Sequence, residues 1–230
     1  MDVKLPSLEI ECDLCESWEI EDANSLLFYI RKDARWHNIL PVEGRRVTSD
    51  DVVYSYKRQR HFGWPNGSLL KAVNGLEALG PDTLRISLAV PDADVMIGLA
   101  NGHSQIVAKE AVDLAGDLKN GPTIGTGPWV LTETQLNSRH VFESNPNYFE
   151  EELPFLNGIN MQIIPDRTTR SAAFRVGLVE IHQMDDAEWH NFRLTNPDAP
   201  YLANKNVNAG LEVALKTSDP LFRDARIRNA

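Results

Sequence analysis

The chain has 230 residues, of which 42% are hydrophobic and 24% charged, an ordinary globular composition with enough apolar material for a sizeable core. Its formal net charge of −10 argues against a nucleic-acid-binding protein, which needs a basic face to meet phosphates. No apolar run approaches the length of a membrane span, and the first residues show no signal peptide.

The two cysteines, Cys12 and Cys15, form a C-x-x-C pair near the start of the chain. No second C-x-x-C and no pair of closely spaced histidines supplies the remaining ligands of a zinc site. A redox pair is expected where a strand leads into a helix, whereas an extended segment, residues 16–20, follows here. We therefore interpret these cysteines as incidental small residues, in preference to a metal or redox role.

Alternating apolar and polar residues, with β-branched and aromatic side chains, predict strands. The segments with this pattern are 26–31, 83–89, 129–133, 140–143, 159–164, 179–182 and 210–215. Capping residues followed by apolar positions at helical spacing predict helices at 48–60, 91–102, 107–115, 166–177 and 185–194. Trp18, Trp36 and Trp129 fall in alternating apolar contexts and are predicted to lie in the core. Strands and helices are interleaved irregularly, which indicates an α/β or mixed α+β fold.

Residues 120–128, which include three glycines and two prolines, predict a chain reversal or a crossing between subdomains. We place a domain boundary there. The chain ends in what the pattern predicts is the beginning of an amphipathic helix, so we expect further sequence downstream.

Catalytic and metal-binding patterns are missing from the sequence. The six histidines are scattered, and there is no H-E-x-x-H motif, no G-x-S-x-G elbow and no Walker loop. Gly125-Thr126-Gly127 precedes a predicted strand and is interpreted as a tight turn, not as a phosphate-binding loop. Acidic pairs such as Asp50 and Asp51 are adjacent, and neighbours on a helix do not share a face. We predict no catalytic residue, no metal and no cofactor.

Five motifs occur in one order along the chain and together carry a family resemblance. The first is WEIEDANSLLFYIRKDARWHNILPVEGRRVTSDDVVYSYKR, followed by IGTGPWVLTE. Next come the Asn-Pro-x-Tyr turn and the Pro-Asp-helix-Gly-x-x-Glu element of ESNPNYFEEELPFLNGINMQIIPDRTTRSAAFRVGLVEI, and finally DPLFRDARIRNA. This series resembles the family 5 solute-binding proteins of ABC importers, which carry oligopeptides, dipeptides or nickel. The loop after His37 is longer than the commonest family version, and Leu221 departs from the usual residue at its position.

The resemblance implies a periplasmic-binding-protein-like lobe with an additional N-terminal α/β subdomain, the second lobe being absent from this sequence. Residues 1–121 would form the additional subdomain and 122–215 part of lobe one. Residues 216–230 would begin the crossover into the second lobe.

Candidate ligand contacts come from strand edges and loop tips, since peptide carriers bind extended ligands through such groups. Gly210 allows close approach of a ligand backbone, although an ordinary central strand with one glycine explains it equally well. Trp64 is interpreted as packing within its subdomain more readily than as a ligand contact. Gln183 lies where family members approach the cleft. The candidate set is Asn208, Gly210, Leu211, Glu212, Gln183 and Trp64.

The resemblance implies a binding component that encloses a peptide or other small solute between two lobes and delivers it to a membrane permease, outside the cytoplasm. The alternative is a ligand-sensing domain of a receptor or regulator with the same fold. A hydrolase is disfavoured by the missing constellation. The residues do not indicate which ligand is bound, because one scaffold serves several functions.

Overall fold

The computed structural model describes residues 9–202, 218, 220 and 223–224. Internal contacts divide the chain into two compact units. The larger unit extends to His182, and the described part of the smaller one begins at Gln183.

A four-stranded antiparallel sheet forms the first part of the larger unit. Its strands are β1 (Cys15–Asp22), β2 (Ser25–Ile30), β3 (Val73–Gly80) and β4 (Thr83–Leu88), in the order β1-β2-β4-β3. The central strands β2 and β4 alternate in side-chain direction, so that one face of each carries apolar residues. That face supplies much of the first core cluster: Leu26, Phe28, Ile30, Leu84, Ile86 and Leu88.

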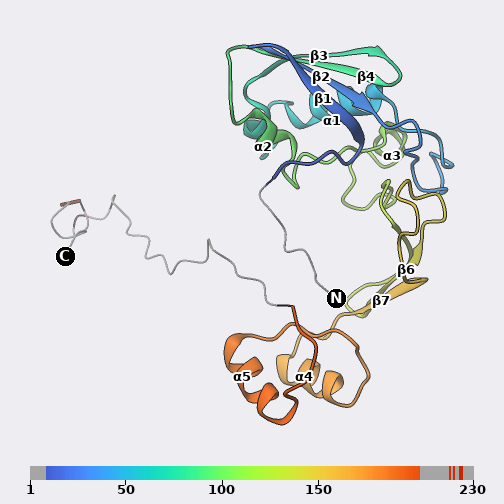
Figure 1. Ribbon diagram of the computed structural model, residues 1–230, viewed down its shortest axis with the longest axis vertical. Coiled ribbons are helices and arrows are strands. Elements are labelled where there is room, and N and C mark those ends of the chain that lie inside the picture. Colours follow the sequence, from blue (N-terminus) through green and yellow to red (C-terminus); the bar gives the residue numbers. More distant parts are fainter. Residues whose placement is uncertain (1–8, 203–217, 219, 221–222, 225–230) are drawn as a thin grey trace. The chain divides into compact units, whose positions relative to one another are not determined.

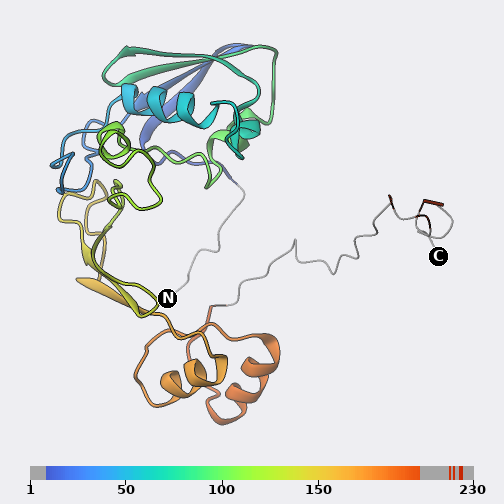
Figure 2. The same ribbon diagram turned by 180° about the vertical axis from the view of Figure 1, so that it is seen from behind.

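Helix α1 (Ser49–Gln59) packs against β3 and β4 and lies along one face of this sheet (Figures 1 and 2). Val52 and Tyr56, four residues apart on one helix face, are buried in the same core cluster. A 3₁₀ turn, η1 (Gly67–Leu70), buries Leu70 completely. Helix α2 (Val95–Leu99) packs against that turn and contributes Val95.

A second apolar cluster surrounds Trp36, which is 1% exposed. Its other buried members are Ala34, Val42, Val47, Ala108 and Ala111. Helix α3 (Lys109–Ala115) supplies Ala111 and ends at Gly116, whose φ of +73° is unfavourable for residues with a side chain. This cluster fixes the loop after β2 against α3.

A separate three-stranded antiparallel sheet follows residues 120–128. It consists of β5 (Trp129–Gln135), β6 (Arg139–Ser144) and β7 (Gly158–Gln162), paired in sequence order. Helix α4 (Arg167–Arg175) comes next, and its N-cap Asp166 accepts a hydrogen bond from the Thr169 N–H. In the smaller unit, Asp185 is the N-cap of α5 (Asp186–Thr195), and its side chain accepts a hydrogen bond from the Glu188 N–H.

The predicted mixed α/β fold is confirmed. Each predicted strand among the described residues has a counterpart, apart from residues 179–182, which are irregular. The five predicted helices are present, although the second is much shorter than predicted, at Val95–Leu99. The predicted strand 210–215 and the C-terminal helix start lie outside the described residues. The domain boundary near residue 121 stays a prediction, and β3 and η1 were not predicted.

The prediction of a core position is wrong for one of the three tryptophans, Trp18. Trp36 is buried and Trp129 partly buried, but 36% of Trp18 is exposed. Trp18 lies on β1, an edge strand of the sheet, where every residue from Glu16 to Asp22 is exposed. The apolar alternation there does not correspond to a covered face.

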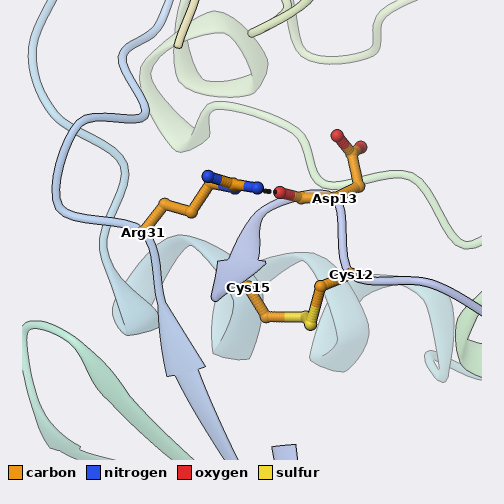
Figure 3. The surroundings of a disulfide bond; sticks show 4 residues. All are labelled: Cys12, Asp13, Cys15 and Arg31. Carbon is orange, nitrogen blue, oxygen red and sulfur yellow. Dashed lines mark hydrogen bonds between the residues drawn. A yellow bond between two sulfur atoms is a disulfide. The ribbon is translucent and has the colours of Figure 1, made fainter. Parts of the chain in front are cut away.

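Our interpretation of Cys12 and Cys15 as incidental is wrong, because the two residues form a disulfide (Figure 3). Their Cα atoms are 5.1 Å apart, within the usual range for a disulfide. The bond closes a short turn immediately before β1. Arg31, which follows β2, holds that turn, since its Nε donates to the Asp13 carbonyl (2.7 Å) and its backbone N–H to that of Leu14 (2.9 Å).

Candidate functional site

The larger unit contains a cavity of about 660 Å³, within the size range of small-molecule sites. Its floor is apolar and comes from the sheet face and α1, through residues such as Phe28, Ile86 and Tyr56. Its other walls are segment 10–15, which the disulfide closes, the residues that follow α2, and residues 122–126 of the glycine- and proline-rich stretch 120–128. Segments that are distant in sequence thus line the same cavity.

Polar side chains of the cavity lining include Asp13, Tyr56 and Ser104. Ser104 is buried, and its hydroxyl donates to the Gly98 carbonyl (2.7 Å) and accepts from Gln59 Nε2 (3.0 Å). Burial raises the pKa of the Tyr56 hydroxyl to about 12, so this group stays neutral and able to donate a hydrogen bond. Desolvation, helped by the nearby Glu150 carboxylate, raises the pKa of Asp13. An apolar floor with polar side chains in the walls suits binding and orientation of a solute.

His37 binds the glycine- and proline-rich stretch 120–128, part of which forms one wall of the cavity. The imidazole is 4% exposed, its Nδ1 accepts from the Gly125 N–H (3.3 Å), and its Nε2 lies 3.1 Å from the Gly127 carbonyl. A backbone N–H can only donate, so Nδ1 carries no proton and Nε2 donates to Gly127. Asn145, also buried, donates from Nδ2 to the same carbonyl (3.0 Å). The predicted tight turn at Gly125-Thr126-Gly127 is a bend, from Thr126 to Pro128, and two buried side chains hold it.

These contacts predict a pH-dependent loss of stability. Burial lowers the pKa of His37 below its ordinary 6.5, so the unfolded chain takes up a proton at a higher pH than the folded one. The free energy of unfolding should therefore fall as the pH drops below about 6.5 and level off below the folded-state pKa. Protonation at Nδ1 also removes the acceptor of the Gly125 N–H.

Urea denaturation across this pH range checks the prediction. His37→Gln offers both an acceptor and a donor without titrating, and should flatten this part of the profile. His190→Gln, at an exposed position, serves as the matched control and should leave it unchanged. An unchanged profile in His37→Gln would contradict the assignment.

A second hollow of about 260 Å³ contains Trp64, one of the residues singled out from the sequence. Trp64 is 43% exposed, and the Arg58 guanidinium lies 4.2 Å from its ring centroid. Packing against Arg58 agrees with the interpretation that Trp64 contacts its own subdomain. Its role toward a ligand stays a prediction.

Of the sequence-predicted site residues, Trp64 and Gln183 are described, and they belong to different units. Gln183 is exposed, outside helices and strands, and belongs to the smaller unit. Asn208, Gly210, Leu211 and Glu212 lie outside the described residues. The cavity residues Asp13 and Ser104 belong to none of the five motifs, whereas Tyr56 belongs to the first motif but was predicted only as part of a helix. Residues 120–128, rich in glycine and proline, also gave a signal in the sequence.

No three or more His, Cys, Asp or Glu side chains within the described ranges are grouped so that they could hold a metal ion. Within the same ranges, no helix is long and apolar enough to cross a membrane.

Comparison with known proteins gives one consistent family. The model of "Bacterial extracellular solute-binding proteins, family 5 Middle" matches residues 9–230. Heme-binding protein A of Haemophilus influenzae is 26% identical over all of this chain and 45% of its own length. The nickel-binding periplasmic protein of Escherichia coli is 30% identical over 73% of this chain and 32% of its own. The chain thus spans less than half the length of these curated relatives.

Solved structures agree with this grouping. The binding protein MoaA from A. tumefaciens R10, in complex with mannopinic acid, superposes with a TM-score of 0.77 and 27% identity, covering 95% of this chain and 44% of that one. The periplasmic binding protein DppA from Helicobacter pylori, in complex with the peptide STSA, has the same fold, with a TM-score of 0.67 at 23% identity over 76% of this chain and 38% of that one.

With the family model matched across residues 9–230 and the fold shared with solved periplasmic binding proteins, the chain belongs to the bacterial extracellular solute-binding proteins of family 5.

Proposed function

We propose that the protein is the substrate-binding component of an ABC importer, which takes up a peptide or similar small solute and presents it to a membrane permease. The observation that carries this proposal is the 660 Å³ cavity, with an apolar floor and polar side chains in its walls, in a chain of this family. Binding alone, without turnover, is what we propose for it, and its named relatives are binding proteins.

The disulfide supports a location outside the cytoplasm. Cys12 and Cys15 are paired next to the cavity wall. Structural disulfides persist mainly in oxidising compartments such as the periplasm and the cell surface. The family description and the periplasmic relatives support the same location.

The ligand class that we favour is a peptide, with solutes such as nickel or haem as the other candidates. Relatives named for dipeptides, nickel and haem are all similar to this chain, so the choice among them needs measurement. We further propose that Asn208, Gly210, Leu211, Glu212 and Gln183 line the ligand from the strand and loop edges predicted from the sequence.

Isothermal titration calorimetry of the protein as its gene encodes it, against dipeptides, oligopeptides, Ni²⁺ and haem, tests the function. We expect micromolar affinity for one class and unaltered ligand by mass spectrometry after the titration. Hydrolysed ligand, or no binding to any class, would contradict the proposal.

Gly102→Trp tests whether the cavity belongs to the site. Gly102 lines the cavity, and a Cβ atom built there meets no atom within 4 Å, so a side chain can start from this position without a backbone clash. We expect its affinity to fall at least about tenfold, the equivalent of about 1.4 kcal/mol. Gly80→Trp, equally unobstructed but outside the cavity lining, is the matched control. Equal affinities would remove the cavity from the site while leaving the function intact.

A further inference from the structure

The segment from Val52 to Leu76 has a charge unlike the rest of the chain. None of the 33 acidic residues falls within it, whereas Lys57, Arg58, Arg60 and Lys71 do, in a chain of net charge −10. Such a local excess of positive charge is an electrostatic feature that attracts anionic partners.

Two aromatic side chains stand in the middle of this basic segment. Phe62 is 98% exposed and Trp64 is 43% exposed, at a turn directly after α1. The exposed Lys57, Arg60 and His61 flank them. We call Lys57, Arg58, Arg60, His61, Phe62 and Trp64 the basic-aromatic loop.

The loop is held in place by its own contacts. The Trp64 N–H donates to the His61 carbonyl (3.2 Å), and Gly63 adopts a φ of +92°, which a residue with a side chain rarely adopts. Arg58 stacks on Trp64, and Gln59 Nε2 donates to the Asn66 carbonyl (3.1 Å). The fold thus keeps Phe62 exposed at a fixed turn, with no other part of the described chain covering it.

We propose that the basic-aromatic loop docks on the surface of a lipid bilayer that contains anionic headgroups. Aromatic side chains favour the boundary between headgroups and acyl chains, and basic residues beside them are attracted by anionic lipid. The almost fully exposed Phe62 beside the exposed Lys57 and Arg60 fits this boundary, because its ring leaves water there while the charges stay among the headgroups. This proposal goes beyond solute binding and does not depend on which ligand the protein carries.

Cosedimentation of the 230-residue chain with vesicles tests the proposal. Vesicles of phosphatidylcholine alone are compared with vesicles of phosphatidylcholine and phosphatidylglycerol. We expect at least about tenfold stronger partitioning onto the anionic vesicles, weakened by added salt. Lys57→Glu/Arg60→Glu should lower this partitioning at least about tenfold. Phe62→Ser, which changes a side chain that is 98% exposed, should lower the partitioning about fivefold.

Matched controls separate this loop from general effects. Phe155→Ser removes another exposed aromatic (84% exposed) and Lys119→Glu reverses another exposed charge, and neither should change partitioning. Urea midpoints of all variants should match that of the parent chain. Equal binding to both vesicle types, or no binding, would overturn the proposal. Loss on charge reversal without loss in Phe62→Ser would also overturn it, because the binding would then be purely electrostatic and the exposed aromatic side chain would take no part.

Discussion

Asp51→Ala should lower the free energy of unfolding by about 3 kcal/mol, because it removes the buried member of an ion-pair network. The Asp51 side chain is 6% exposed and accepts two hydrogen bonds from the Arg45 guanidinium, at 2.7 and 2.9 Å. It also accepts from the Thr48 N–H (2.9 Å) at the start of α1, so the variant loses a helix cap as well. Glu110 on α3 binds the other side of the same guanidinium (2.6 and 2.8 Å).

The network joins the loop before α1 to α3, and both carboxylates raise the pKa of the Arg45 guanidinium while Arg45 lowers that of Glu110. Asp50→Ala is the matched control, since it removes the same side chain one residue earlier, at an exposed position of the same helix turn. Asp50 offers mainly a favourable interaction with the helix dipole, and its loss should cost about 0.3–1 kcal/mol. Urea denaturation of both variants near pH 7 measures the two losses in the free energy of unfolding. Equal losses would show that the network contributes little beyond the dipole.

Helix starts could be predicted from the sequence because their signals are local. Thr48, Asp166 and Asp185 each precede a helix that begins at the next residue. A capping side chain acts on N–H groups two or three residues away, so a short window contains the whole interaction. Helix ends at glycine are equally local, as Gly116 shows.

Features that depend on distant contacts were missed. Strand β3 (Val73–Gly80) contains two glycines and a glutamate, and its pairing with β4 overrides that weak local preference. Trp18 has an apolar alternating context, yet its edge strand has no covering layer among the described residues. The C-x-x-C spacing is shared by metal sites, redox sites and disulfide-closed turns, so the spacing alone did not predict the disulfide.

The candidate cavity could be predicted only in part. The glycine- and proline-rich stretch 120–128 predicted an irregular segment, because those residues report backbone conformation, and part of that stretch lines the cavity. His37, which holds that segment from 88 residues away in sequence, gave no local signal, since a scattered histidine is informative only once its partners are known. The same holds for Ser104, whose partners are a helix carbonyl and a glutamine from another helix.

The 230-residue chain should bind its solute feebly, at millimolar affinity or weaker, where the protein as its gene encodes it binds at micromolar affinity. The family resemblance implies two lobes that close around the ligand, and the chain spans 45% or less of its curated relatives. Sites of this type remove about 70–90% of a ligand's surface from water. We expect one lobe to cover about half of that surface and to leave the charged ends of a peptide solvated.

Association still costs about 4–15 kcal/mol in lost translational and rotational freedom, whether one lobe or two contact the ligand. Losing half the contacts at an unchanged cost should therefore weaken binding by about 4 kcal/mol, which is about a thousandfold. Calorimetry of both proteins against one peptide mixture measures the difference. The Gly102→Trp variant of the chain indicates whether any residual binding lies in the 660 Å³ cavity. Equal micromolar affinity for the two proteins would contradict the prediction and would place the whole site within these 230 residues, because no second lobe would then be needed to exclude water from the ligand.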